Sequence, residues 1–305
     1  MSNIDSSASS VGSAVAASDH IASPAGNHWV EGLRRLGKNK VATICFFVFI
    51  IIFLACMFAP VITKWDYTTI NKDFQLEPPS LNHLLGTDNL GRDVFSRLLY
   101  GGRITLRIAV TTAILAAALG CAIGLPAGYF GGRLDALVSP VLDLIGSIPV
   151  ILLVIVTEFA LGWGRGNFMY AMVIAAIPQF ARLIRASVMN IIGREYIEAA
   201  RALGVSHKMI MLRHIMHNIA PALIVRFTTG VAEALLTCTI MGYLGIGINP
   251  PTPEWGYIVF STKSYIRRAP HLVVIPCVLI AVTVISLSLF GDGLRDALDP
   301  RDGRV

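Results

Sequence analysis

Charged residues are scarce in this sequence. Aspartate, glutamate, lysine and arginine make up 14% of the 305 residues, whereas soluble domains carry roughly 25%. Hydrophobic residues make up 54%, and the mean hydropathy is +0.66. A composition this apolar excludes an ordinary soluble protein and predicts a membrane protein. The net charge of +6 therefore reflects the placement of bases at the membrane surface, and no nucleic-acid partner is expected.

The sequence also lacks the motifs of several kinds of enzyme. It has no G-x-x-x-x-G-K-[ST] phosphate-binding loop, so the chain is not expected to be an ATPase. It has neither an H-E-x-x-H metal-binding pair nor a G-x-S-x-G nucleophile elbow. We therefore expect no catalytic residue and no enzymatic activity on this chain.

No metal-site pattern is present either. The five cysteines all lie in apolar segments without C-x-x-C spacing, which is typical of small packing residues; they are Cys45, Cys56, Cys121, Cys238 and Cys277. Three histidines lie close in sequence, at 207, 214 and 217, but no carboxylate completes a ligand set. We expect no metal ion and no cofactor on this chain.

What the sequence does have is long apolar runs. A membrane helix needs about 20 apolar residues, and six segments qualify: 41–62, 108–132 and 269–291 strongly, and 136–161, 166–181 and 221–248 more weakly. We therefore predict an all-α, polytopic membrane protein with six transmembrane helices. An even number of spans places both termini on one side. Four bases before the first run favour the cytoplasm for that side (N-in/C-in); they are Arg34, Arg35, Lys38 and Lys40.

These runs divide the chain into five expected parts. Residues 1–28 are rich in serine and alanine and should be a disordered cytoplasmic tail. Residues 29–62 should form an amphipathic helix and the first transmembrane helix, and 63–103 an external loop with a short helix. Residues 104–290 should form the transmembrane core, which includes a cytoplasmic segment at 194–221, and 291–305 a cytoplasmic tail.

Between two apolar runs lies a polar, basic stretch, residues 195–221. Apolar residues recur in it every three or four positions, as on one face of a helix; they are Ile197, Ala200, Leu203, Met209, Leu212 and Ile215. Gly204 should bend the helix, because glycine costs about 1 kcal/mol relative to alanine mid-helix. The pattern predicts a helix–Gly–helix surface element with one face free for a protein partner. An ordinary amphipathic loop is the alternative.

The residues of this stretch resemble a family signature. Glu198-Ala199-Ala200, then Gly204 and Ile215, is similar to the motif of membrane subunits of binding-protein-dependent ABC importers. The family usually continues Ile-Leu-Pro, whereas here the proline is displaced to position 221. In that family the segment is the coupling helix, which docks onto a separate ATPase subunit. The resemblance thus implies ATPase-coupling roles for Glu198, Ala199, Ala200, Arg201, Gly204, His207 and Leu212, with ATP and Mg²⁺ held by the partner.

Three further stretches resemble the C-type permeases of the dipeptide, oligopeptide and nickel importer subfamily. They are L-G-T-D-x-x-G-R-D-x-x-S-R-L at 85–98, N-P-P-T-P-E-W-G at 249–256 and G-D-G-L-R-D-A-L-D-P at 291–300. The resemblance implies the type-1 ABC importer transmembrane fold in the bacterial (inner) cell membrane. It also implies three kinds of partner: a B-type permease forming a heterodimer, two cytoplasmic ATPase subunits, and an external substrate-binding protein.

The function implied is that of the permease subunit of an ATP-driven importer of dipeptides or short peptides. The coupling segment would act as a lever that switches the pathway between outward and inward access. Oligopeptides, glutathione or chelated nickel are alternative substrates on the same fold. An ion-driven secondary transporter is the alternative from another class, although no internal repeat is evident.

Two sets of residues are candidates for contact with substrate or binding protein. Six residues of the external loops are expected to face the binding protein: Asp88, Arg92, Asp93, Pro251, Glu254 and Trp255. A structural clamp, with Asp93 and Arg97 at i, i+4 spacing, is the alternative for the 83–103 stretch.

Within the membrane, Glu233 is the candidate for the translocation path, because acidic residues at this depth are costly. A hydrogen bond to a neighbouring helix is the alternative.

Two other acids lie in the expected third span. Asp143 is expected to pair with Arg133 or another base of the inner loops, and Glu158 to reach the membrane interface. Small residues in the second span, including Gly120 and Gly124, favour close helix packing. Pro149 and Pro178 should kink their helices.

Overall fold

The computed structural model describes residues 28–162, 165–248 and 250–298. The expected tail at 1–28 lies outside this part of the chain apart from its last residue, as do residues 299–305. Within the described residues the regular structure is helical, and the single β-bridge joins Thr87 to Asp93. The predicted all-α class is confirmed.

In the described part of the chain, five helices are long and apolar enough to cross a membrane. They are α3 (Lys40–Met57), α5 (Val94–Phe130), α8 (Arg165–Met189), α11 (Met216–Tyr243) and α13 (His271–Leu298). α11 continues from α10 (His207–Met209) through a π-helical turn at Ile210–Ile215. α13 runs past residue 291, where the sequence analysis places the start of the tail.

The sixth predicted span is a bent pair of helices. α6 (Gly132–Ser147) and α7 (Val150–Leu161) meet at 98°. Pro149 stands at the junction as the N-cap of α7, with an extended backbone, and proline cannot continue the hydrogen bonding of a preceding helix. At about 18 Å, α7 is too short to cross about 30 Å of hydrocarbon alone. The described residues thus contain six candidate spans only if the pair is counted as one.

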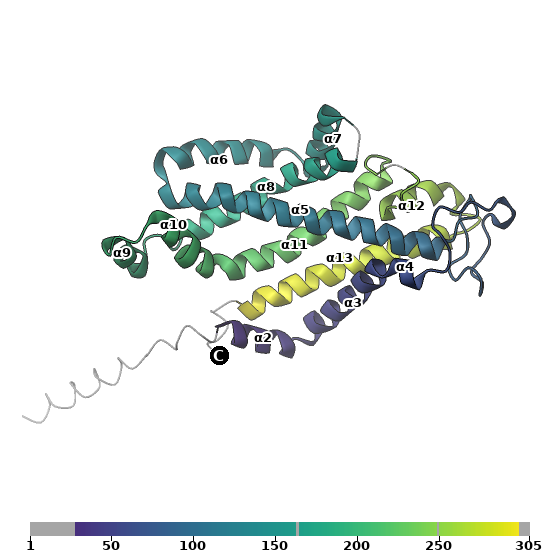
Figure 1. The fold of residues 1–305 in the computed structure, drawn as a ribbon, viewed down its shortest axis with the longest axis horizontal. Helices are drawn as coiled ribbons and strands as arrows, with labels where there is room; N and C mark the ends of the chain where they lie inside the picture. Colours follow the sequence, from purple (N-terminus) through teal and green to yellow (C-terminus); the bar gives the residue numbers. More distant parts are fainter. Residues whose placement is uncertain (1–27, 163–164, 249, 299–305) are drawn as a thin grey trace, which may run out of the picture.

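The connecting elements gather at two ends of the molecule (Figure 1). α9 (Glu195–Ala202) and α10 lie at one end, and α2 (His28–Lys38) and the last turns of α13 lie toward it. At the other end lie α4 (Ala59–Ile62), the 63–93 loop with its 3₁₀ turn Lys72–Phe74, α12 (Trp255–Thr262) and the turn Lys263–Tyr265. α5 runs the whole distance between the two ends.

α5 and α8 pack with their backbones close together. A Cβ atom added to Gly124 would lie 2.4 Å from the carbonyl oxygen of Ala181, and one added to Gly120 would lie 2.6 Å from the Cβ of Phe180. Gly128 approaches α8 in the same way. These glycines recur every four residues, so they share one helix face. Gly120 and Gly124 are the two for which close helix packing is predicted from the sequence.

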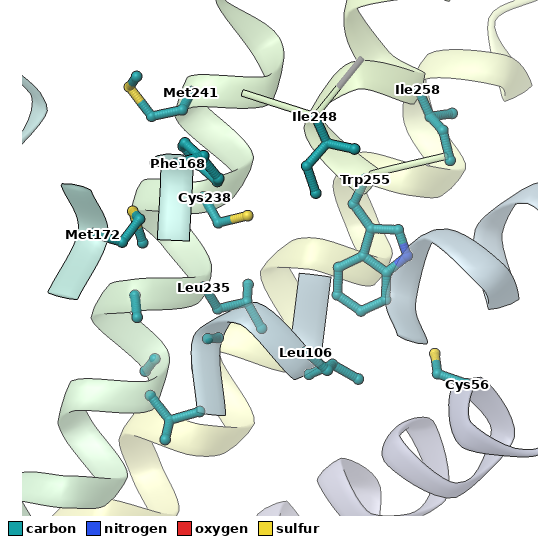
Figure 2. Packing of buried hydrophobic residues seen from close by; sticks show 14 of the residues in the cluster. Cys56, Leu106, Phe168, Met172, Leu235, Cys238, Met241, Ile248, Trp255 and Ile258 are labelled. Carbon is teal, nitrogen blue, oxygen red and sulfur yellow. The ribbon is translucent and has the colours of Figure 1, made fainter. Parts of the chain in front are cut away.

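The larger hydrophobic core lies toward the end that holds α12. It brings together residues of α5, α8, α11 and α12, of which Leu106, Phe168, Met172, Leu235, Met241 and Trp255 are labelled in Figure 2. Trp255 is fully buried, and its indole Nε1 donates a hydrogen bond to the carbonyl of Leu98 at 2.8 Å. This bond fixes α12 against the first turns of α5.

Candidate functional site

The segment that joins α8 to α11 is a helix, a left-handed glycine and a second helix. Gly204 follows α9 with φ +75°, a conformation that glycine adopts without strain. Its N–H bonds to the carbonyl of Arg201 at 3.0 Å, and the N–H of Val205 bonds to that of Ala200 at 3.1 Å. This is the hydrogen-bond pattern of a Schellman C-cap. The Ser206 hydroxyl then accepts from the Met209 N–H and starts α10.

The expected apolar stripe of this segment is divided between two surfaces. Ile197 and Ile215 are fully buried, whereas Leu203 is 83% exposed and Leu212 66% exposed. The single stripe was wrong because the turn at Gly204 and the π turn Ile210–Ile215 change which residues share a face. The buried residues anchor the segment to the helices beneath it. Ile210 is one of them, whereas Met209, which was expected in the stripe, is exposed. The exposed set forms an apolar surface at the end of the molecule.

The other expected coupling residues lie mostly on the outside. Glu198, Ala199, Arg201, Gly204 and His207 are exposed, but Ala200 is buried among the anchoring residues. No atom lies within 4 Å of a Cβ added to Gly204. The glycine is therefore required in this chain by its backbone conformation, and the space around it is open.

Tyr129, near the end of α5, ties α5 to this segment. Its hydroxyl is hydrogen-bonded to His207 Nδ1 at 2.8 Å. The Arg201 guanidinium lies 5.0 Å from the centre of the same ring, within cation–π range. Tyr129 is not predictable from the sequence, because nothing in its spacing shows that the start of α10 returns to the end of α5.

Glu233 lines a cavity of about 210 Å³ between α5, α7, α8 and α11. Its side chain is 55% exposed and receives two bonds from Arg226, at 2.9 and 2.8 Å. Arg226 also donates to Gln179 of α8 and lies 5.2 Å from the centre of the Phe180 ring. A hydrogen bond from Glu233 to a neighbouring helix was the alternative in the sequence. In the structure it is Arg226 that makes such a bond, to Gln179 of α8.

Arg226 and Gln179 are functional candidates that sequence analysis missed. Arg226 stands seven positions, about two helical turns, before Glu233. An i, i+7 spacing of opposite charges in one apolar helix was the available signal. Gln179, in contrast, can be placed beside them only from the packing of α8 against α11.

The 83–103 stretch forms a buried polar cluster at the opposite end. The Asp88 carboxylate accepts from the backbone of Leu90 and from Arg92, whose Nε lies 2.8 Å away, and it pairs with Arg97 at 3.4 Å. Asp93 caps α5 by accepting from the Ser96 N–H at 2.7 Å. Arg97 thus pairs with Asp88, and the expected Asp93–Arg97 pair does not form.

Most of the residues expected to face the binding protein are interior. Asp88, Arg92 and Asp93 are at most 9% exposed, and Glu254 and Trp255 at most 1%; only Pro251 is exposed. These charged groups can be interior because each has a buried partner, and a buried charge without a partner is costly. The motif residue Asn249 lies outside the described part of the chain. Asp88, Arg92 and Asp93, in the 83–103 stretch, fit the structural clamp that was considered as the alternative.

Glu254 is the N-cap of α12. Its carboxylate accepts from the N–H groups of Gly256 and Tyr257 at 2.9 and 2.8 Å, and from the hydroxyl of Thr105 at 3.2 Å. Burial raises the pKa of this carboxyl to about 7, although the three hydrogen bonds act to lower it. Glu254 therefore titrates near neutral pH while it holds α12 onto α5.

The remaining two acids differ in their surroundings. Asp143 lies 3.7 Å from Arg182, and both side chains are well exposed. The base that pairs with Asp143 is therefore Arg182 and not Arg133. Glu158 is fully buried in α7, so it does not reach the interface as expected.

Comparison with family models gives two matches. The family described as binding-protein-dependent transport system inner membrane component matches residues 120–302. The family described as the N-terminal TM domain of oligopeptide transport permease C matches residues 27–79. The first match covers the coupling segment, the cavity residues of α8 and α11, and α12.

Curated relatives cover most of the chain. A dipeptide transport system permease protein of Alkalihalophilus pseudofirmus is 37% identical, over 90% of each chain. A di/tripeptide transport system permease protein of Pseudomonas aeruginosa is 38% identical, over 84% of this chain and 86% of its own. A glutathione transport system permease protein of Escherichia coli O157:H7 is 36% identical, over 90% of each.

Among solved structures, a chain of the MetNI methionine ABC transporter in an inward-facing conformation has the same fold. The TM-score is 0.55 at 22% identity, and the match covers 66% of this chain and 96% of the other. This likeness concerns the arrangement of helices alone.

Proposed function

Because the chain belongs to the family of binding-protein-dependent transport system inner membrane components, we propose that it works as the permease subunit of a bacterial ABC importer for short peptides. It is an integral protein of the inner membrane with the type-1 importer fold. Relatives named for dipeptide and di/tripeptide transport support the peptide class.

An importer permease of this family acts together with a second permease, an ATPase and a binding protein. In finer detail, we propose a heterodimer with a B-type permease, two ATPase subunits that hold ATP and Mg²⁺, and a substrate-binding protein outside the membrane. The end of the molecule with α9 and α10 would face the cytoplasm. The basic residues Arg34, Arg35, Lys38 and Lys40 lie in and just after α2, toward this same end, and bases favour the cytoplasmic side.

The observation that carries the coupling role is the division of the 195–215 segment into anchors and an exposed apolar surface. Ile197 and Ile215 bind it to the membrane helices, while Leu203 and Leu212 are free to enter a cleft on the ATPase. Burying one leucine side chain contributes about 1.5–3 kcal/mol. Movement of the ATPase would then be passed to α8 and α11 by their covalent connection to the segment, and to α5 through Tyr129.

Replacing an exposed leucine by a charge tests the docking surface. We expect Leu203→Asp to reduce co-purification of the ATPase with the permease, because a carboxylate would be buried without a partner. Leu81→Asp is the matched control: Leu81 is 98% exposed but lies in the loop at the opposite end. Equal loss of the ATPase in both variants, or in neither, would argue against docking at α9.

The substrate class is tested on the assembled importer. The permease, its ATPases and the binding protein encoded beside it are reconstituted in liposomes, and ATP hydrolysis is measured with dipeptides, longer peptides, glutathione and chelated nickel. Glutathione is included because a relative at 36% identity is named for it. Stimulation by dipeptides is expected. Uptake that continues without any ATPase would instead indicate an ion-driven transporter.

A further inference from the structure

The 210 Å³ cavity has two opposite charges on one side of it. Arg226 and Glu233 both come from α11, two turns apart, and Gln179 and Phe180 of α8 hold the guanidinium from the other side. At 1.5 Å per residue, Glu233 lies about 15 Å from the Tyr243 end of α11, which is about half the thickness of the hydrocarbon core. Glu233 is therefore deep in the membrane.

The exposure of Glu233 shows which way this face of α11 points. A carboxylate that is 55% exposed at this depth is costly against lipid, even when a neighbouring arginine compensates part of its charge. The exposed side of the pair must then face either a polar partner surface or water. In a permease that functions as a heterodimer, the translocation path between the two subunits provides such a surface.

Two buried polar groups at the cavity have no partner among the described residues. They are the Nε of Arg226 and the hydroxyl of Thr112, a residue that is only 1% exposed and lines the cavity from α5. Buried polar groups are almost always hydrogen-bonded. A cavity lined by such groups, together with a charge pair that is open on one side, is suited to a polar ligand.

We propose that Arg226 and Glu233 form a binding site for the two charged ends of a short peptide in transit. The guanidinium would exchange Glu233 for the peptide's terminal carboxylate, in the bidentate geometry that arginine favours. The carboxylate of Glu233 would then accept from the peptide's terminal ammonium group. Each charge keeps an opposite partner during this exchange, so binding leaves no unpaired charge at membrane depth. The proposal rests on the proposed function as a peptide importer.

The small size of the cavity limits what it holds. Ligand pockets usually measure about 300–1,000 Å³, so about 210 Å³ accommodates the backbone of a dipeptide, with its side chains directed toward the partner permease. The site would thus recognise the termini, which all dipeptides share, and not their side chains.

Substrate protection tests the site directly. Thr237, which lines the cavity and is partly exposed, is changed to cysteine in a chain whose five native cysteines are replaced by serine. The full permease–ATPase complex is labelled with a maleimide in the absence of binding protein. We expect millimolar dialanine to slow the labelling, and N-acetyl-dialanine amide, which has no charged ends, to have no effect. Equal protection by both peptides, or by neither, would overturn the proposal.

Charge removal distinguishes a peptide site from a structural ion pair. R226Q/E233Q leaves no unpaired charge, so a merely structural pair would tolerate it and dipeptide transport would stay at the wild-type rate. A peptide site predicts a fall of at least about tenfold, which corresponds to about 1.4 kcal/mol of lost interaction. D143N/R182Q removes a different ion pair, which joins α6 to α8 outside the cavity; it is expected to transport normally.

The outcomes also separate this proposal from the proposed function. If wild-type liposomes take up no peptide, the importer assignment itself fails. If they do take up peptide while R226Q/E233Q matches the wild type and dialanine gives no protection, only the site is excluded. Co-purification of the ATPase with each variant verifies that the complex has assembled.

Discussion

At the scale of single residues, the backbone conformation at position 204 explains why a glycine stands there. Gly204 has a positive φ and open space around it. A Cβ atom there would have no atom of the described residues within 4 Å, so its cost arises from the left-handed backbone and from any partner that docks nearby.

This distinction gives the first prediction. We expect Gly204→Val to abolish uptake, because a β-branched residue is strained at φ +75° and the Schellman turn would be lost. Gly204→Asn should keep substantial uptake, since asparagine tolerates this conformation. Uptake by liposomes and membrane insertion are measured for both variants. Normal uptake by Gly204→Val would contradict the requirement for the turn.

Glu254 gives a prediction of pH dependence. Its folded-state pKa of about 7 lies above the ordinary value of 4.5. A raised carboxyl pKa means that the folded protein binds the proton more tightly than the unfolded protein does. The contribution of Glu254 to stability is therefore greatest below about pH 4.5 and is lost as the pH rises through about 7.

Thermal unfolding of the purified complex at pH 5 and pH 8 measures this contribution. The wild type should lose stability between the two values, and E254Q, which cannot ionise, should lose less. The comparison concerns the slope, because the amide also alters the hydrogen bonds of the cap. Identical slopes for the two proteins would show that Glu254 does not titrate in this range.

At the scale of elements, the contact between α5 and α8 depends on the absence of side chains. Gly120, Gly124 and Gly128 face the backbone of α8, and hydrogen-atom side chains allow the two helices to touch. Association of helices in lipid relies on such close van der Waals contact.

We therefore predict that Gly124→Ala destabilises the protein. The added methyl group would lie 2.4 Å from a backbone oxygen, and overpacking costs about 1–3 kcal/mol. Gly37→Ala is the control, since nothing lies within 4 Å of it in α2 and alanine is the better helix former. Melting temperatures in detergent should fall for the first variant and not for the second.

The sequence predicts where the helices lie along the chain better than it predicts how they pack against one another. Long uncharged runs reveal α3, α5 and α13, because a transmembrane helix is defined by length and apolarity alone. Pro149 indicated a kink, but its size, a 98° turn that makes two helices, depends on what packs around it. The burial of Asp88 and Glu254 was missed for a related reason. Arg97 is nine positions from Asp88 and Thr105 is 149 positions from Glu254, so neither partner follows from local helix spacing.

At the scale of the whole molecule, the helices place two different surfaces about one α5 length apart, roughly 55 Å at 1.5 Å per residue. One end has the exposed leucines of the coupling segment, and the other has the loops clamped by buried polar groups. The proposed orientation assigns the first end to the cytoplasm.

Cysteine labelling tests this orientation. A cysteine at Leu81, which is 98% exposed, should react in intact cells with a maleimide that does not cross the membrane. A cysteine at Leu203 should react only after the cells are opened. The reverse pattern would invert the topology, and with it the assignment of α9 to the ATPase.

The clamp between α5 and α12 also has a consequence for how the protein is made. The Trp255 N–H bonds to the hydroxyl of Thr105, 150 residues earlier in the chain. At translation rates of about 5–20 residues per second, roughly 8–30 s separate the synthesis of the two partners. During that interval the 83–103 stretch has already been synthesised, but the α12 residue that covers its Gly101–Gly102 end, Trp255, does not yet exist. Newly made chains are therefore most open to proteolysis in this loop, and ribosome stalling before residue 254 should leave it cleavable.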